Sequence, residues 1–161
     1  MTASPPKRPT PQEELDDART YAIIGAAIEV HRTLGSGFVE RVYHLALGAE
    51  FRRRGILHDP KPSIPVWYQG EAVGIHRPHY VCLDAVLVEL RAQPALTPAD
   101  SAQVQGVLQA ARLDVGLLLN FGTPILEKRR LARPWVKAPS GVPVWPTPGV
   151  TAHPTPIAPP P

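Results

Sequence analysis

The sequence is poor in cysteine and in long hydrophobic runs. It has one cysteine in 161 residues, which excludes an intramolecular disulfide and a cysteine-rich zinc site. No apolar run approaches the roughly 18 residues of a membrane-spanning helix, and the amino terminus lacks the apolar segment of a signal peptide. We therefore expect a soluble, cytoplasmic protein without a membrane partner.

Proline is scarce in the middle of the chain and concentrated at its ends. Of 21 prolines, four lie in the first 11 residues and ten lie between Pro134 and the carboxyl terminus. Proline-rich segments do not sustain helices or sheet ladders, because proline lacks a backbone donor. We predict disordered ends over residues 1–12 and 134–161, and one folded domain over residues 13–133.

Charge of one sign does not dominate the chain. The net charge is +3 and the isoelectric point is about 9.3, a modest basic excess that is compatible with a nucleic-acid partner without requiring one. The densest basic runs are F-R-R-R-G at residues 51–55 and E-K-R-R-L-A-R at residues 127–133. The first run is explained equally well by a helix end, where cations are favourable.

Three segments carry helical signals. Apolar residues recur at intervals of three and four between Pro11 and Leu34, and the L-G-S-G stretch then ends this helix. A second helix is predicted from about Phe38 to Arg54. A third begins after Thr97, a favourable N-cap that is followed by proline at the first helical position.

The remaining ordered segments resemble strands. Strands are expected at residues 64–68, around residues 79–83 and 85–90, at residues 115–121 and, as a last strand, at residues 125–131. The fourth has no polar alternation, which predicts a strand that is buried on both faces with a parallel neighbour. The order helix, helix, three strands, helix, strand predicts an α/β protein with a mixed β-sheet flanked by helices.

Ionisable side chains gather at the end of one predicted strand. Glu89 and Arg91 are two residues apart, so they point to the same face. If the second and third predicted strands form a hairpin with its turn near Asp84, His79 lies opposite Glu89 and Arg77 lies opposite Arg91. Such a group suits phosphodiester chemistry, but it also suits an ordinary strand end.

The ordinary interpretation is a cross-strand ion pair between Glu89 and either Arg91 or Arg77. Such a pair stabilises a sheet by a few tenths to about 1 kcal/mol. Gln103, on the first turns of the third helix, is placed to lie beside this strand end. It is equally consistent with an exposed helix residue.

The sequence resembles the GxxExxY family, which is regarded as a branch of the PD-(D/E)XK nuclease-like superfamily. The segment I-I-G-A-A-I-E-V-H-R-T-L-G-S-G-F-V-E-R-V-Y contains the motif as Gly37, Glu40 and Tyr43. The segments V-L-V-E-L-R-A and V-G-L-L-L-N-F-G follow at the matching places. The resemblance covers about residues 21–133 and implies a restriction-endonuclease-like core.

The resemblance assigns roles to single residues. The superfamily's metal-binding aspartate, ten residues before its glutamate, falls on His79, and the glutamate is Glu89. The lysine two residues later is Arg91. The helix glutamine is Gln103, but the tyrosine four residues beyond it is Val107. A further glutamate position that is common in the family is Glu29.

These departures predict a degenerate metal site. Magnesium prefers oxygen ligands, and histidine in place of aspartate removes a negative charge and offers nitrogen. His79 with Glu89 would suit manganese or zinc better. Arg91 replaces a compact ammonium group with a planar fork. We expect weak or no catalysis, with magnesium or manganese as the cofactor if the protein is active.

Three of these positions, and His31 in the first helix, also have a purely structural interpretation. Glu29 lies opposite the apolar stripe of its helix and is expected to be solvated. His31, on the apolar side, suits a hydrogen-bonded core histidine. Glu40 suits the start of a helix, where its charge complements the helix dipole. Tyr43 is most simply a core residue.

Three functions are compatible with these patterns. The first is a metal-dependent nuclease that uses Glu89 and Gln103, with Arg91 stabilising charge on the phosphate. The second is a non-catalytic module that binds DNA or RNA through Arg77 and Arg91. The third is a protein-interaction subunit, in which the proline-rich tail serves as a docking peptide. The histidine at position 79 favours the second and third.

Overall fold

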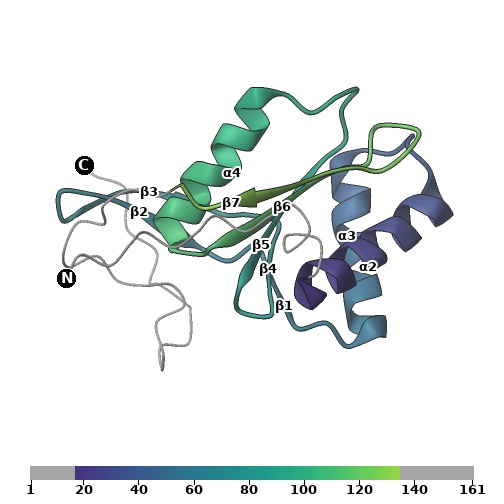
Figure 1. Ribbon diagram of the computed structural model, residues 1–161, viewed down its shortest axis with the longest axis horizontal. Helices are drawn as coiled ribbons and strands as arrows, with labels where there is room; N and C mark the ends of the chain where they lie inside the picture. The colour runs from purple at the N-terminus through teal and green to yellow at the C-terminus, as the bar shows by residue number, and fades with distance from the viewer. Residues whose placement is uncertain (1–16, 135–161) are drawn as a thin grey trace, which may run out of the picture.

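The structure is a computed structural model that describes residues 17–134. The proline-rich ends predicted from the sequence therefore lie outside the described residues, apart from Pro134. A five-stranded mixed sheet has the order β1-β4-β5-β6-β7, with α4 on one side and α2 and α3 on the other (Figure 1). The α/β class with a mixed sheet flanked by helices is confirmed.

The two amino-terminal helices are α2 (Ala18–Leu34) and α3 (Glu40–Arg54). The first begins later than the predicted Pro11, because the extended Asp17 acts as its N-cap and accepts a hydrogen bond from the Arg19 amide. The second ends at Gly55, which adopts the left-handed conformation with φ of 66°. Its three terminal arginines lie where cations favour a helix end.

The centre of the sheet comes from the second half of the described chain. It is formed by β4 (Tyr80–Cys82), β5 (Val86–Arg91) and β6 (Val115–Asn120), with α4 (Pro98–Ala111) crossing between β5 and β6 and with β7 (Glu127–Ala132) as the edge strand beside β6. β5 and β6 are parallel, and β6 is buried throughout, as the sequence predicted. The β4–β5 hairpin turns through Leu83 and Asp84, which both have positive φ.

Alternate residues of β5 build two separate cores. Val86, Val88 and Leu90 pack in the cluster formed with α2 and α3. Leu87 packs on the opposite face in the cluster formed with α4. On that face, a Cβ atom added to Gly116 would lie 2.9 Å from Val104 Cγ1, so the glycine permits the close approach of α4 to the sheet.

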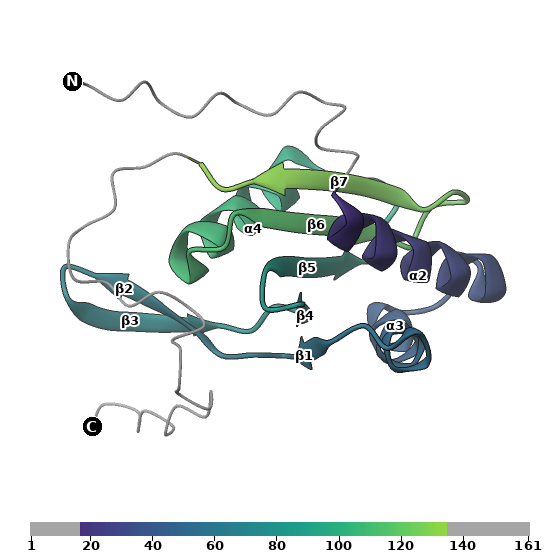
Figure 2. The same cartoon turned by 60° about the horizontal axis from the view of Figure 1, so that its bottom comes forward.

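Two strands were not predicted from the sequence. The short β1 (His58–Pro60) forms the edge of the main sheet, and β3 (Glu71–His76) pairs with β2 (Ile64–Tyr68) in a separate two-stranded sheet. This hairpin has an irregularity between Val66 and Trp67. Figure 2 shows that it extends away from the side of the molecule that carries α2 and α3.

None of the helices within residues 17–134 combines the length and apolar character needed to cross a membrane.

Candidate functional site

A buried carboxylate lies at the carboxyl end of β5. Glu89 is only 3% exposed. Because side chains alternate along a strand, Glu89 and Arg91 share the α4 face of the sheet with Leu87. A charge at this depth is costly unless it is paired, so its partners define the site.

Two histidines hold the two oxygens of Glu89. Oε1 lies 2.8 Å from His76 Nε2, and Oε2 lies 2.7 Å from His79 Nδ1. His76 is the last residue of β3, and His79 directly precedes β4. The structure thus places His79 beside Glu89, as the predicted hairpin register requires.

The second ring nitrogen of His79 contacts α3. His79 Nε2 lies 2.9 Å from Glu40 Oε1. An ionised carboxylate only accepts hydrogen bonds, so the imidazolium form is the one that satisfies both carboxylates. The Leu90 amide lies 3.3 Å from Nδ1, but Nδ1 of an imidazolium is a donor and accepts no hydrogen bond from it. Glu40, for which the sequence left a capping role and a site role open, reaches the site from the first turn of α3.

Burial and hydrogen bonding act in opposite directions on these groups. Burial lowers the pKa of His79, but the hydrogen bonds to Glu40 and Glu89 outweigh it and raise the pKa above its usual value. Burial raises the pKa of Glu89, but the hydrogen bonds from His76 and His79 bring it down to about 2. The hydrogen bond from His79 also lowers the pKa of Glu40. The cluster therefore stabilises a cationic His79 between two anions.

Arg91 turns toward α4 and away from Glu89. Its Nε lies 3.0 Å from Asp100 Oδ1, its Nη2 lies 2.5 Å from Gln103 Oε1, and its Nη1 is 3.8 Å from Glu89 Oε2. Asp100 also closes the capping box with Thr97 at the start of α4. An ion pair between Glu89 and an arginine was expected, but Arg91 is the most distant of these partners of Glu89. The two histidines are its main partners.

Arg77 does not join the site. Its Nε donates a hydrogen bond to Ser63 Oγ at 3.2 Å. The expected position opposite Arg91 is wrong, because β4 begins only at Tyr80 and Arg77 continues the end of β3.

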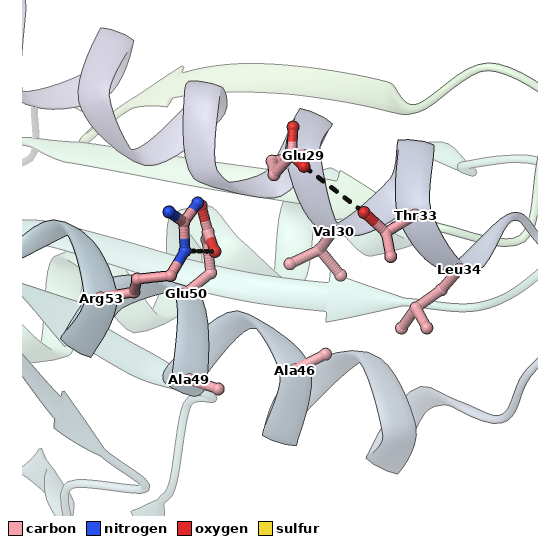
Figure 3. Close-up of a pocket in the computed structure, with 8 residues that line it drawn as sticks. All are labelled: Glu29, Val30, Thr33, Leu34, Ala46, Ala49, Glu50 and Arg53. Carbon is pink, nitrogen blue, oxygen red and sulfur yellow. Dashed lines mark hydrogen bonds and ion pairs between the residues drawn. The ribbon is translucent and has the colours of Figure 1, made fainter.

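Glu29 also lies away from Glu89. It lines a groove between α2 and α3, with Glu50 and Arg53 on the opposite wall (Figure 3). Its carboxylate lies 2.7 Å from Arg32 Nη2. It is partly exposed, as its place on the helical wheel predicted.

The remaining motif residues, Tyr43 and Gly37, and the helix residue His31 lie within the fold away from Glu89. Tyr43 is fully buried, donates a hydrogen bond to the Gly35 carbonyl at 2.5 Å and stacks on Phe121 with 4.7 Å between ring centroids. Gly37 lies in the turn before α3. His31 is half-buried, with Nε2 2.9 Å from the Thr123 carbonyl. The core roles expected for Tyr43 and His31 agree with these contacts.

Sequence reasoning missed two residues of the site, His76 and Asp100. Asp100 carried a readable signal, since an acidic residue three positions after the N-cap Thr97 is typical of a capping box. His76 carried none, because its strand was not predicted. Its position follows only from the β2–β3 register, in which it pairs with Ile64.

The arrangement of these residues does not fit a magnesium ion. Both oxygens of Glu89 face imidazole nitrogens, whereas magnesium requires oxygen ligands in octahedral geometry. Within residues 17–134, no group of three or more His, Cys, Asp or Glu side chains is arranged to hold a metal ion.

Comparisons with known proteins give the family. No curated protein and no solved structure gave a significant match. A model of the PD-(D/E)XK nuclease superfamily matches residues 17–133, which is the described domain and more than half of the chain. The mixed five-stranded sheet with helices on both faces agrees with this match. The chain belongs to the PD-(D/E)XK nuclease superfamily.

Proposed function

We propose that this chain is a GxxExxY-type member of the superfamily that associates with nucleic acid and has a degenerate metal site with weak or no catalysis. The observation that carries the proposal is the position of His79, whose two ring nitrogens lie within 2.9 Å of Glu40 and Glu89. It also supports the finer family assignment, because Glu40 is the glutamate of the G-x-x-E-x-x-Y motif and it faces the site.

The positive charge of His79 opposes the binding of a divalent cation. At the position matching the superfamily's metal-binding aspartate, this chain carries an imidazolium that contacts two carboxylates and offsets one of their two negative charges. A divalent cation would have to displace that positive charge. It would then bind a site with one carboxylate fewer than the aspartate and glutamate of the superfamily. Hard cations gain little from imidazole nitrogen. The expected consequence is weak binding of magnesium.

Arg91 strengthens the argument. The lysine of an active site offers a compact ammonium group to a phosphate, but the guanidinium of Arg91 is held by Asp100, Gln103 and the Leu90 carbonyl. These contacts occupy its planar fork. Approach to a phosphate beside Glu89 would require breaking them.

Nucleic-acid association is supported by cations around the site. Arg41, Lys61 and Arg77 are exposed, and within residues 17–134 none of the three forms an ion pair. Lys61 and Arg41 lie close enough to His44 on α3 to assist burial in lowering its pKa to about 4. Unpaired surface cations suit phosphate contacts, which supply most of the affinity of non-specific binding.

The test combines metal titration with a cleavage assay. Calorimetric titration of magnesium and manganese should show little binding to the wild type and a gain in the His79→Asp/Arg91→Lys double variant. Fluorescent DNA and RNA should bind the wild type without being cut. Glu89→Ala is the negative control for any cleavage.

Two results would contradict the proposal. Metal-dependent cleavage by the wild type that disappears in Glu89→Ala would identify an active nuclease. A wild type that binds neither DNA nor RNA would favour a protein-interaction subunit. In that case the inherited fold would be only a scaffold.

A further inference from the structure

The β2–β3 hairpin exposes an unusual concentration of large apolar side chains. Its strands carry five exposed residues of this kind, Val66, Trp67, Tyr68, Val73 and Ile75. An isolated two-stranded hairpin is marginally stable in water. Exposed apolar surface on such a projecting element indicates an interaction site.

One face of this hairpin combines aromatic and cationic groups. In the strand register, Pro65 pairs with Ile75 and Trp67 pairs with Ala72, so these side chains share a face. Continuing the register past its end places Ser63 opposite Arg77, and the Arg77–Ser63 hydrogen bond agrees with this. Arg77, Ile75 and Trp67 therefore follow one another along one face, from the base of the hairpin toward its tip.

The charges on this face have one sign. Arg77 is exposed, and within the described part of the chain no carboxylate lies within ion-pair distance of it. The hairpin's own carboxylate is Glu71, which pairs with Tyr68 in the register and so falls on the other face. A face with a free cation and no anion complements a polyanion better than it complements a second copy of itself.

The base of the hairpin lies at the site. His76 ends β3 and contacts Glu89, and Arg77 is the next residue. A strand of nucleic acid that passes the carboxyl end of β5 would therefore meet Arg77 first and Trp67 farther out.

We infer that the β2–β3 hairpin is a contact for single-stranded nucleic acid, with Trp67 stacking on an unpaired base and Arg77 contacting a backbone phosphate. The inference rests on the proposed nucleic-acid association and specifies where and in what form the strand binds. Stacking on tryptophan needs an exposed base face, which a single strand offers and an intact duplex does not.

The test measures binding of the full chain to labelled oligothymidylate and oligouridylate by fluorescence anisotropy. Trp67→Ala should weaken binding about 5- to 150-fold, the range for loss of one base–aromatic stack, and Trp67→Phe should recover most of it. Tyr21→Ala is the matched control, because Tyr21 is 76% exposed on α2, away from the hairpin. It should leave the affinity unchanged.

Salt dependence separates the two roles. Arg77→Gln should reduce the slope of log affinity against log salt by about 0.7, the value for one phosphate contact on a single strand. Trp67→Ala should leave that slope unchanged, since stacking releases no counterion. Circular dichroism of each variant shows whether the fold is retained.

Three results would overturn the inference, and they are distinguishable. Wild-type binding that Trp67→Ala leaves intact removes the hairpin's role while the proposed function stands. A wild-type dimer that Trp67→Ala converts to a monomer without loss of nucleic-acid affinity makes the hairpin a contact between copies. A wild type that binds no nucleic acid removes both proposals.

Discussion

Two buried glutamates of this protein have similar acidity and different surroundings. Glu89 and Glu50 have side chains that are 4% and 10% exposed, and hydrogen bonds bring the pKa of each down to about 2. Glu50 is held by Arg53 and Arg54 from the following turn of its own helix. Glu89 is held by histidines that come from the ends of other strands.

The difference lies in the nature of the partners. Arginine stays charged at any pH that a protein tolerates, so the Glu50 cluster keeps its charges once Glu50 has ionised. Histidine loses its charge near neutrality, so the charge balance around Glu89 depends on pH. Two carboxylates of similar pKa are therefore stabilised in different ways. Permanently charged arginines of its own helix hold Glu50, whereas titratable histidines that are distant in the sequence hold Glu89.

The largest expected difference is in stability. His79→Ala removes a buried partner of Glu89 and leaves the carboxylate to His76 alone. We expect the free energy of unfolding to fall by about 3 kcal/mol, as for other broken buried pairs, in urea denaturation at pH 6. Adding Glu89→Gln to His79→Ala should recover part of the loss, because the unpaired charge is gone. A loss below about 1 kcal/mol in His79→Ala would contradict the cost expected for breaking a buried pair.

The second difference is in pH dependence. The pKa of His79 is raised in the folded state, so its stabilisation is complete below the unfolded value of about 6.5 and is lost as pH rises through the folded pKa. We expect the wild type to lose stability relative to His79→Gln above about pH 6.5, with a slope of at most about 1.4 kcal/mol per unit. Most of the contribution of His44 cancels in this comparison, because burial, the largest cause of its lowered pKa, is the same in both proteins. Parallel stability curves would contradict the assignment.

Glu89 makes the stability of the fold depend on pH in the acid range. Its folded pKa is depressed, so its contribution is present above the unfolded value of about 4.5 and is lost as pH falls toward 2. Chemical denaturation between these values should show wild-type stability falling with pH more steeply than that of Glu89→Gln. Equal dependence in the two proteins would show that Glu89 has an ordinary acidity.

The smallest expected effect is at Glu50. Arg53 is 67% exposed, so its ion pair with Glu50 is screened by solvent. Arg53→Ala should lower the free energy of unfolding far less than His79→Ala does, and about 1 M salt should remove the difference from the wild type. A loss as large as that of His79→Ala would erase the contrast between the two clusters.

The sequence predicted the parts of this structure that depend on local pattern. The helices around Ile23, Leu47 and Val104, the buried strand at Leu117 and the Thr97 N-cap all follow from spacing and capping rules. The His79–Glu89 contact also followed, because a tight hairpin fixes which residues face each other. The observed pair Tyr80 and Val88 has that same register.

The parts that failed depend on where strands end and on which elements meet. Arg77 was assigned to the wrong hairpin, because nothing local shows that β4 starts at Tyr80. β3 went unrecognised, since E-A-V-G-I-H contains a glycine and is almost wholly exposed, and His76 was lost with it. The choice between a cap and a site role for Glu40 needed the packing of α3 beside β4, which no spacing encodes.

The tight β4–β5 turn has a consequence for how the chain assembles its charges. Glu89 and His79 are 10 residues apart, whereas His79 and Glu40 are 39 apart. Closing the longer loop costs about 1 kcal/mol more of chain entropy. In the unfolded chain Glu89 and His79 thus meet more readily than His79 and Glu40 do. The Glu89–His79 contact requires little more than the β4–β5 hairpin. Glu40 reaches His79 only when α3 packs against the sheet, so the Glu40–His79 contact forms only in the completed fold.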